Sequence, residues 1–284
     1  MNTFQSLGLR NDLLEAVQSL GFTEPTPIQQ KAIPVLLEGT RDFVGLAQTG
    51  TGKTAAFGLP LLQLIRPADR YPQALIICPT RELCLQITGD LDKFKGAKSP
   101  LGVTAVYGGA SIVMQIKDLK RGTHIVVATP GRLIDLIERK AIRLEEIQYV
   151  VLDEADEMLN MGFKDDLDFI LDKTPKTKNT WLFSATMPAK VVQFSNTILK
   201  EPETVNATPS SSAAQNVEQL LFYVHKQHKM ELCLHLLRNT IKGNILIFRR
   251  TKMGIAKLEK MLKGNGYNVD SIHGDKTQND RENA

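Results

Sequence analysis

The sequence predicts an α/β fold built on a doubly wound parallel sheet, and three observations lead to that prediction. Short apolar runs alternate with segments of helical spacing over residues 1–206. The runs are continuous and not alternating, which is typical of strands that helices cover on both faces. The length of 284 residues is enough for about two domains of ~150 residues each.

Each predicted strand leads into a helical pattern, as repeated strand–helix–strand units require. In chain order the strands are DFVGLA (42–47), ALIIC (74–78), VTAVY (103–107), HIVVA (124–128), YVVL (149–152) and TWLF (180–183). Because consecutive strands are separated by helices, we expect them to run parallel in one sheet.

A second, smaller unit is predicted after this region. The stretch ATPSSSAAQN (207–216) is rich in small polar residues and predicts a flexible linker. Strand-like runs then resume as QLLFYV (219–224), NILIF (244–248) and NVDSI (268–272). We therefore expect a first domain at 1–206, a linker at 207–216 and part of a second α/β domain at 217–284.

Composition and charge exclude several classes of protein. Apolar residues make up 42% of the chain and charged residues 23%, and no run approaches the ~18 consecutive apolar positions of a membrane helix. The start of the chain lacks a basic patch followed by an apolar core, so a cytoplasmic location is the default expectation. Residues 217–284 hold 12 Lys/Arg against 7 Asp/Glu, which suits either a polyanion partner or a solvated surface.

Three cysteines, Cys78, Cys84 and Cys233, form no CxxC pair. Paired cysteines at short spacing are the usual sign of a metal site or a redox motif. We therefore expect all three to be buried thiols.

The segment AQTGTGKT (47–54) follows a predicted strand and opens a helix, which is the context of a phosphate-binding loop. Gly50 and Gly52 would let backbone N–H groups face phosphate oxygens, Lys53 would reach the β and γ phosphates, and Thr54 would bind Mg²⁺. The helix N-terminus adds a partial positive charge. Ala47 stands where the general pattern has its first glycine.

The run VVLDEAD (150–156) places Asp153, Glu154 and Asp156 at the end of a buried strand. Three acids so close together repel one another, which indicates that a positive group, most simply a metal ion, lies among them. With Mg²⁺ between the phosphates and this strand, Asp153 would hold the ion through water, and Glu154 would orient and deprotonate the attacking water. Acids that cap the next helix are the alternative, but they leave the phosphate loop unexplained.

Asp-Glu-Ala-Asp (153–156) following AQTGTGKT resembles the DEAD-box family of ATP-dependent RNA helicases. The resemblance implies a RecA-like P-loop NTPase domain and the first part of a second RecA-like domain, with ATP and Mg²⁺ as cofactors and RNA as partner. GFTEPTPIQ (21–29) resembles the family's Q motif, in which Gln29 would hydrogen-bond the adenine edge, and Phe4 stands where an aromatic stacks on adenine. The implied nucleotide-binding residues are Phe4, Phe22, Gln29, Thr49, Gly50, Thr51, Gly52, Lys53 and Thr54.

Three further segments, PTREL (79–83), Gly108–Gly109 and TPGR (129–132), follow predicted strands. Hydroxyls, arginines and free helix-start amides are phosphate ligands that do not depend on base identity. The resemblance implies RNA-backbone binding by Pro79, Thr80, Arg81, Gly108, Gly109, Thr129, Gly131 and Arg132. SAT (184–186) couples hydrolysis to unwinding in the family, so the implied catalytic residues are Lys53, Asp153, Glu154, Ser184 and Thr186.

In the second unit NILIFRRT (244–251) and IHGDKTQNDR (272–281) resemble later motifs of the family. The resemblance implies RNA contacts by Arg249, Thr251, His273, Gly274 and Gln278, with Arg281 in the same motif. Every motif except the Q motif lies at the carboxyl end of its strand, where open parallel sheets bind ligands. We therefore expect ATP and RNA to bind at one edge of the first domain.

The sequence departs from the family in one respect, because it contains no ARGxD-like or HRxGR-like segment. In the family these supply an arginine finger, worth roughly 10³ to 10⁵ in turnover, and part of the RNA clamp. We expect a truncated helicase that binds ATP, hydrolyses it poorly and fails to unwind. A DNA-directed helicase, an ATP-gated RNA clamp or scaffold without unwinding, and a small-molecule kinase are the alternatives.

Overall fold

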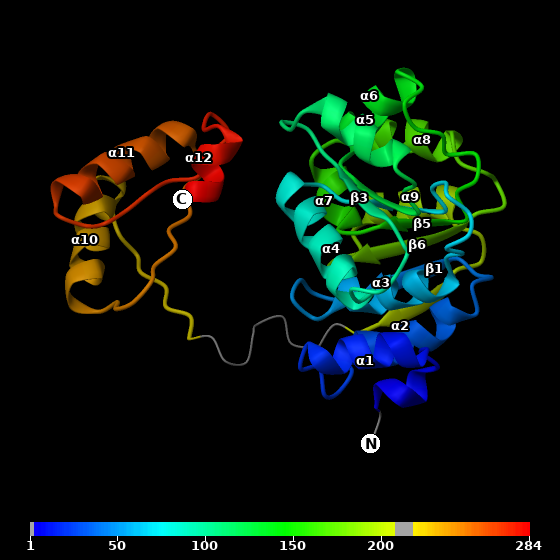
Figure 1. Ribbon diagram of the computed structural model, residues 1–284. Coiled ribbons are helices and arrows are strands. Elements are labelled where there is room, and N and C mark those ends of the chain that lie inside the picture. Colours follow the sequence, from blue (N-terminus) through cyan, green and yellow to red (C-terminus); the bar gives the residue numbers. More distant parts are fainter. Residues whose placement is uncertain (1–2, 208–217) are drawn as a thin grey trace. The chain divides into compact units, whose positions relative to one another are not determined.

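A seven-stranded parallel sheet dominates the computed structural model, which describes residues 3–207 and 218–284 (Figure 1). The strands are β1 (Phe43–Leu46), β2 (Ala74–Ile77), β3 (Val103–Val106), β4 (Ile125–Ala128), β5 (Tyr149–Leu152), β6 (Asn179–Ser184) and β7 (Glu203–Asn206). Their order across the sheet is β3-β4-β2-β5-β6-β1-β7. The predicted fold class and all six predicted strands of this region are confirmed.

Helices cover both faces of the sheet because each strand is apolar on both sides. In β5, Tyr149 and Val151 pack into one core, and Val150 and Leu152 pack into the other. The first core is covered by η1 (Phe4–Leu7), α1 (Asn11–Ser19), α2 (Pro27–Leu37), α3 (Lys53–Leu64) and α4 (Arg81–Phe94). The second is covered by α5 (Ile112–Lys120), α6 (Pro130–Glu138), α7 (Ala155–Asn160), α8 (Lys164–Asp172) and α9 (Ala189–Ile198).

Strand β7 was not predicted, because its sequence ETVN is not an apolar run. It lies at the edge of the sheet, pairs only with β1, and is largely exposed. Backbone hydrogen bonds fix its two ends: Glu203 N donates to Asp42 O (3.0 Å) and Ala207 N donates to Leu46 O (2.8 Å). An edge strand needs little apolar surface when one neighbouring strand supplies its ladder.

Asp42 connects three elements at the amino edge of the sheet. Its side chain is buried, and its Oδ1 accepts a hydrogen bond from Thr180 N (2.6 Å) at the start of β6. Its Oδ2 accepts one from Lys200 N (2.6 Å), just past α9. A carboxylate that accepts two backbone hydrogen bonds fixes the start of β1 relative to both neighbours, because charge-assisted bonds are short and strong.

We predict that Asp42→Ala lowers the free energy of unfolding of the first unit by about 2–4 kcal/mol, because it leaves the buried Thr180 N–H and the partly buried Lys200 N–H without acceptors. Urea denaturation followed by the fluorescence of Trp181, the single tryptophan of the chain, measures this loss. Asp172→Ala is the control, since Asp172 is exposed and pairs only with the exposed Lys176. Equal midpoints for the two variants would contradict the assigned role of Asp42.

The chain divides into two units, Met1–Ser210 and Ser211–Ala284. The predicted linker at 207–216 lies, except for Ala207, outside the described residues. The second unit contains η2 (Lys226–His228), α10 (Lys229–Asn239), α11 (Lys252–Gly264) and α12 (Gln278–Asn283). The domain bounds of the sequence analysis therefore stay a prediction.

The three strands predicted for the second unit, at 219–224, 244–248 and 268–272, are wrong. None of these described runs forms a strand, and exposed side chains within them include Tyr223 (93%) and Phe248 (87%). Leu258 and Leu262 are the buried apolar residues among the described part of this unit. A strand is stable only with a paired neighbour and covered faces, and this unit supplies neither to its apolar runs.

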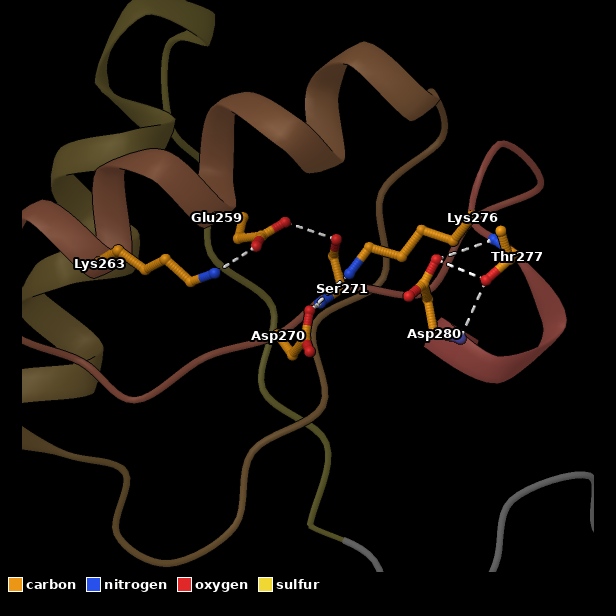
Figure 2. A network of polar contacts seen from close by, with 7 residues as sticks. All are labelled: Glu259, Lys263, Asp270, Ser271, Lys276, Thr277 and Asp280. Atoms are coloured by element: carbon orange, nitrogen blue, oxygen red, sulfur yellow. Dashed lines mark hydrogen bonds and ion pairs between the residues drawn. The ribbon is translucent and has the colours of Figure 1, made fainter. Parts of the chain in front are cut away.

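Polar contacts hold the last loop of the second unit against α11 (Figure 2). Glu259 of α11 accepts hydrogen bonds from Lys263 Nζ (2.6 Å) and from Ser271 Oγ (2.5 Å). Asp270 in turn accepts from Ser271 N (2.7 Å) and Lys276 Nζ (2.5 Å). The Lys263 and Lys276 ammonium groups lower the pKa of Glu259 and Asp270 respectively through these bonds. The loop before α12 is therefore held by side chains and not by a strand ladder.

Two of the expected buried thiols are confirmed, since Cys78 and Cys84 are buried, but Cys233 in α10 is only partly buried. Cys78 and Cys84 lie where β2 and α4 pack in the first core. Cys233 differs because the second unit has so little core. Among the described residues, no helix has both the length and the apolar character needed to cross a membrane.

We predict that amides in the runs 219–224 and 244–248 exchange with solvent far faster than those of β4, β5 and β6. These runs have no strand ladder to protect their N–H groups, whereas the central strands are paired on both sides. Hydrogen exchange read by mass spectrometry of peptides measures the difference. Protection of the two runs equal to that of β5 would show that they pair after all.

Candidate active site

The predicted functional segments of the first unit follow the carboxyl ends of six parallel strands. Residues 47–54 follow β1, 78–81 follow β2, 107–109 follow β3, 129–132 follow β4, 153–156 follow β5 and 184–186 follow β6. All six strands run parallel in one sheet, so these segments share one edge. The structure therefore gathers these six segments at a single edge, whereas Phe4 is buried in the first core and Phe22 lies near Phe94, the last residue of α4.

The phosphate loop has the backbone that its glycines were expected to allow. Gly50 and Gly52 have φ of +81° and +90°, values that residues with a Cβ rarely adopt. Gly52 is the N-cap of α3, which begins at Lys53. The free N–H groups of the first turn of α3 therefore open at the loop, as in an anion site at a helix start.

Lys53 and Asp153 meet at the centre of this edge. Lys53 is 6% exposed and Asp153 is 2% exposed, and 3.8 Å separates Lys53 Nζ from Asp153 Oδ1. The ammonium has no hydrogen-bond partner among the described residues. A buried ammonium without a hydrogen bond is costly, and a phosphate oxygen is a group that would satisfy it. The two residues on which the sequence hypothesis depends thus lie on the same side of the sheet.

Asp153 is held in an environment that disfavours its charge. Burial raises its pKa from 3.8 to about 6, although Lys53 counteracts the rise and Glu154 adds to it. Its Oδ1 accepts a hydrogen bond from Glu154 N (3.0 Å). A positive group at this position would restore the ordinary ionisation of the carboxyl, which fits the expected cation. Among the described residues, no three His, Cys, Asp or Glu side chains form a cluster that could hold a metal by themselves.

Glu154 has a left-handed backbone, with φ 54° and ψ 49°. This conformation costs a residue with a Cβ roughly 1–2 kcal/mol, so the surroundings must impose it. The side chain of Glu154 is half-buried, and its Oε1 accepts a hydrogen bond from Thr49 Oγ1 (3.2 Å) in the phosphate loop. The carboxylate is therefore turned towards the loop that would hold the terminal phosphates.

The third acid, Asp156, has a different partner from the other two. Its Oδ2 accepts hydrogen bonds from Thr186 N (2.9 Å) and Thr186 Oγ1 (2.7 Å), and Asp156 N donates to Ser184 Oγ (3.3 Å). Burial alone would raise the pKa of Asp156, but the hydrogen bonds from Thr186 and Ser184 outweigh it and the pKa lies below its ordinary value. Asp156 thus connects the acid segment after β5 to the Ser184–Thr186 segment after β6.

Gln29 is buried and joins the start of α2 to the phosphate loop. Its Nε2 donates to Gly52 O (3.1 Å) and its Oε1 accepts from Thr26 N (2.9 Å). One further N–H and one lone pair of the amide remain for a ligand. Phe4 is buried in the first core at 6% exposure, whereas Phe22 is 45% exposed with its ring 6.3 Å from that of Phe94.

The predicted RNA-binding segments of the first unit lie against one another. Thr80 caps α4, because its Oγ1 accepts from Leu83 N (3.2 Å), and Arg81 is the first residue of that helix. The Arg81 guanidinium lies against Gly108, where an added Cβ would stand 3.4 Å from Arg81 Nη2. Thr129 is the N-cap of α6, which begins with Pro130 and includes Gly131 and Arg132. The helix starts of α4 and α6 are therefore both at this edge.

One residue here was missed by the sequence analysis. Gln115 of α5 is 6% exposed and bonds both to the loop after β3 and to Arg132. Gln115 is an isolated glutamine inside an amphipathic helix and belongs to no motif, so neither the charges nor the motifs of the sequence single it out.

Arg249 and Thr251 contact other residues of the second unit. Arg249 Nη1 lies 3.2 Å from Met230 Sδ, and Thr251 caps α11 by accepting from Gly254 N (3.2 Å). His273 is half-buried and Gly274 is exposed. The side chain of Gln278 lies outside the described residues, and the roles expected for this set stay predictions.

We predict that Asp153→Asn raises the free energy of unfolding of the ligand-free chain at pH 8 by about 1–3 kcal/mol. The folded-state pKa of about 6 lies above the ordinary 3.8, so the folded chain binds this proton more tightly. The carboxyl therefore contributes stability below pH ~4 that is lost as the pH rises through 6, and the advantage of the variant shrinks towards pH 4.

Urea titrations at pH 4, 6 and 8 measure this gain, with Asp165→Asn as a control because Asp165 is exposed on α8. A variant that is less stable than the parent chain at pH 8 would contradict the prediction.

Two solved structures resemble this chain over its whole length. The chain matches a structure titled "S. cerevisiae Dbp5 bound to RNA and ADP BeF3" with a TM-score of 0.89 and 30% identity, covering 100% of this chain and 72% of the other. A DEAD box protein from the hyperthermophile Methanococcus jannaschii matches with a TM-score of 0.70 and 38% identity, covering 100% and 76%.

Among curated proteins, the DEAD-box ATP-dependent RNA helicase CshA of Streptococcus pneumoniae is 46% identical over 278 residues, which cover 98% of this chain and 53% of the relative. CshA of Geobacillus kaustophilus is 43% identical over 278 residues, covering 98% and 59%. The chain therefore spans a little more than half the length of the curated relatives that it matches.

Two family models match consecutive parts of the chain. The helicase conserved C-terminal domain matches residues 228–284. The DEAD/DEAH box helicase model matches residues 26–194, more than half of the chain, and includes both Lys53 and the acids after β5. The chain belongs to the DEAD/DEAH box helicase family.

Proposed function

We propose that this chain provides the ATP-binding and RNA-binding part of an ATP-dependent RNA helicase, which couples ATP binding and hydrolysis to local unwinding of RNA duplexes. The approach of Lys53 Nζ to Asp153 Oδ1 is the observation that carries the proposal. A buried cation with no hydrogen bond, beside a buried acid and a helix start, is an arrangement that a nucleotide's terminal phosphates would complete.

Nucleotide binding would begin at the phosphate loop and end at Gln29. The amides of the loop and of the first turn of α3 would hold the phosphates, and Lys53 would neutralise their charge. Thr54 and Asp153 would hold Mg²⁺, which supplies positive charge against the phosphate oxygens. The free N–H and lone pair of Gln29 match the donor and acceptor on the paired edge of adenine. Because Gln29 also bonds Gly52 O, base recognition and phosphate binding would share one fixed loop.

Hydrolysis would depend on Glu154 as the general base for the attacking water. Its left-handed backbone and its contact with Thr49 direct the carboxylate towards the phosphate loop. Asp156 would couple the acid segment after β5 to Ser184 and Thr186, since it forms hydrogen bonds with both residues. A change in the position of the acid segment after β5 would therefore move the segment after β6.

RNA would bind along the same edge through its phosphate backbone. The helix starts of α4 and α6, the turn at Gly108–Gly109, Arg81 and Arg132 are all suited to phosphate oxygens and are insensitive to base identity. Arg249, Thr251, His273, Gly274 and Gln278 of the second unit are proposed as further RNA contacts. Competition between RNA and DNA oligonucleotides of one sequence tests the choice of RNA, because contacts to the 2′-hydroxyl distinguish the two.

We predict that Glu154→Gln lowers the rate constant of ATP hydrolysis about 10²- to 10⁴-fold, because the amide cannot accept a proton from water. The affinity for ATP should change little, since Gln keeps the size of the side chain and its hydrogen bond from Thr49. Single-turnover hydrolysis with saturating RNA measures the rate, and binding of a fluorescent ATP analogue measures the affinity.

Glu157→Gln is the matched control, because Glu157 is an exposed acid in the first turn of the same helix α7. Its rate constant should equal that of the parent chain. If Glu154→Gln left hydrolysis by the full-length protein unchanged, an ATP-gated RNA clamp would replace the helicase as the preferred function.

A further inference from the structure

Gln115 is a buried polar residue that lies behind the predicted RNA-binding edge and has no part in nucleotide binding. It is 6% exposed on α5, and both ends of its amide are used. Nε2 donates to Tyr107 O (3.0 Å), and Oε1 accepts from Arg132 Nη1 (2.9 Å). A buried amide satisfied on both sides is costly to replace, because either partner would be left without a hydrogen bond.

These bonds fix the position of the turn at Gly108–Gly109. Tyr107 precedes the turn and Ala110 follows it, and Arg132 Nη1 also donates to Ala110 O (3.1 Å). Gln115 and Arg132 therefore hold one carbonyl on each side of the glycine pair. Gly109 has φ +89°, a conformation that residues with a Cβ rarely adopt, so the turn depends on glycine as well as on these anchors.

Arg81 lies against the same turn. A Cβ on Gly109 would overlap the Arg81 guanidinium, so the glycine is what allows the arginine to lie across the turn. Arg81, the glycine turn and Arg132 thus bring the segments after β2, β3 and β4 together, and Gln115 bonds both Tyr107 O before the turn and Arg132. Loosening Gln115 would change the spacing between phosphate-binding groups without removing any of them.

The amide of Gln115 matches both of its partners. The side chain must donate to a carbonyl and accept from a guanidinium at the same time, which Glu at neutral pH and Met cannot do. Met would fill a similar volume and leave Tyr107 O and Arg132 Nη1 each without one partner.

We propose that Gln115 is a positioning residue for RNA binding, which sets the glycine turn and the Arg132 guanidinium at the spacing of a phosphodiester backbone. This inference rests on the proposed function. Gln115 acts through its two partners and does not touch RNA itself. The groups that it orients are a turn and a guanidinium, so the effect extends equally to all base sequences.

The test measures two affinities of the 284-residue chain. One is for a labelled single-stranded RNA with a saturating non-hydrolysable ATP analogue, and the other is for a fluorescent nucleotide without RNA. Gln115→Met is expected to raise the RNA dissociation constant about tenfold, because one charge-assisted bond loses its orientation. The nucleotide dissociation constant should stay within about twofold, since Gln115 bonds no residue of the phosphate loop.

Gln73→Met is the matched control. Gln73 is fully buried just before β2, at the opposite edge of the sheet, and it forms three hydrogen bonds with Arg66 and Asp69. This variant should lose stability, read as a lower melting temperature, and keep the RNA affinity of the parent chain. A purely structural role for Gln115 would make the two variants alike.

A double variant separates positioning from direct contact. If Gln115 acts partly through Arg132, the combined loss in Gln115→Met/Arg132→Met is smaller than the product of the two single losses. A simple product of the two losses would overturn this part of the proposal.

If Gln115→Met does not fold, Gly109→Ala disturbs the same turn from the Arg81 side without emptying a buried site, and it should raise the RNA dissociation constant by a similar factor. Unchanged RNA affinity in the folded variant, or an equal loss in Gln73→Met, overturns the inference alone. Failure of the parent chain to bind RNA overturns the proposed function and this inference with it.

Discussion

The structure of this chain is organised around two opposite charges that are buried together without forming a hydrogen bond. Lys53 and Asp153 follow β1 and β5, which both neighbour β6, so two strand spacings of ~5 Å each lie between them. The long lysine side chain closes that distance to 3.8 Å. Because β6 lies between the two strands, its own carboxyl end, Ser184, falls beside the pair. The order of these three parallel strands therefore places Lys53, Asp153 and the hydrogen bond between Asp156 and Ser184 close together.

The two edges of the sheet use buried polar groups in different ways. At the amino edge, the side chains of Asp42 and Gln73 are bonded to backbone groups. Asp42 fixes the start of β1 relative to its neighbours, and Gln73 fixes the loop between α3 and β2. At the carboxyl edge, Lys53 Nζ and Asp156 Oδ1 are buried without a hydrogen bond among the described residues. Groups of the first kind stabilise the fold, whereas those of the second kind cost stability until a ligand arrives. This contrast distinguishes Lys53 from Asp42 without any motif.

Much of the fold could be predicted from sequence because the central strands are continuous apolar runs, and Tyr149–Leu152 is representative. The edge strand at Glu203–Asn206 could not, since its stability comes from pairing with β1 and not from its own side chains. The runs at 219–224 and 244–248 have the apolar sequence of buried strands. Burial also needs neighbouring apolar residues, and the described part of the second unit buries only two of these, Leu258 and Leu262. The phosphate loop and the first two acids were predictable from spacing alone. The hydrogen bonds of Asp156 with Ser184 and Thr186, and those of Gln115 with Tyr107 and Arg132, join segments that are distant in the sequence. No local sequence pattern predicts them.

The left-handed backbone of Glu154 and the raised pKa of Asp153 have a consequence for laboratory evolution. Both residues are unfavourable for folding in the ligand-free chain, since a glycine at the first and an asparagine at the second would relieve strain and desolvation. A selection that rewards only heat resistance would therefore accumulate Asp153→Asn and Glu154→Gly, and it would remove the two acids proposed for magnesium binding and hydrolysis. Libraries built on this scaffold need a catalytic screen in every round, with these two adjacent positions held constant.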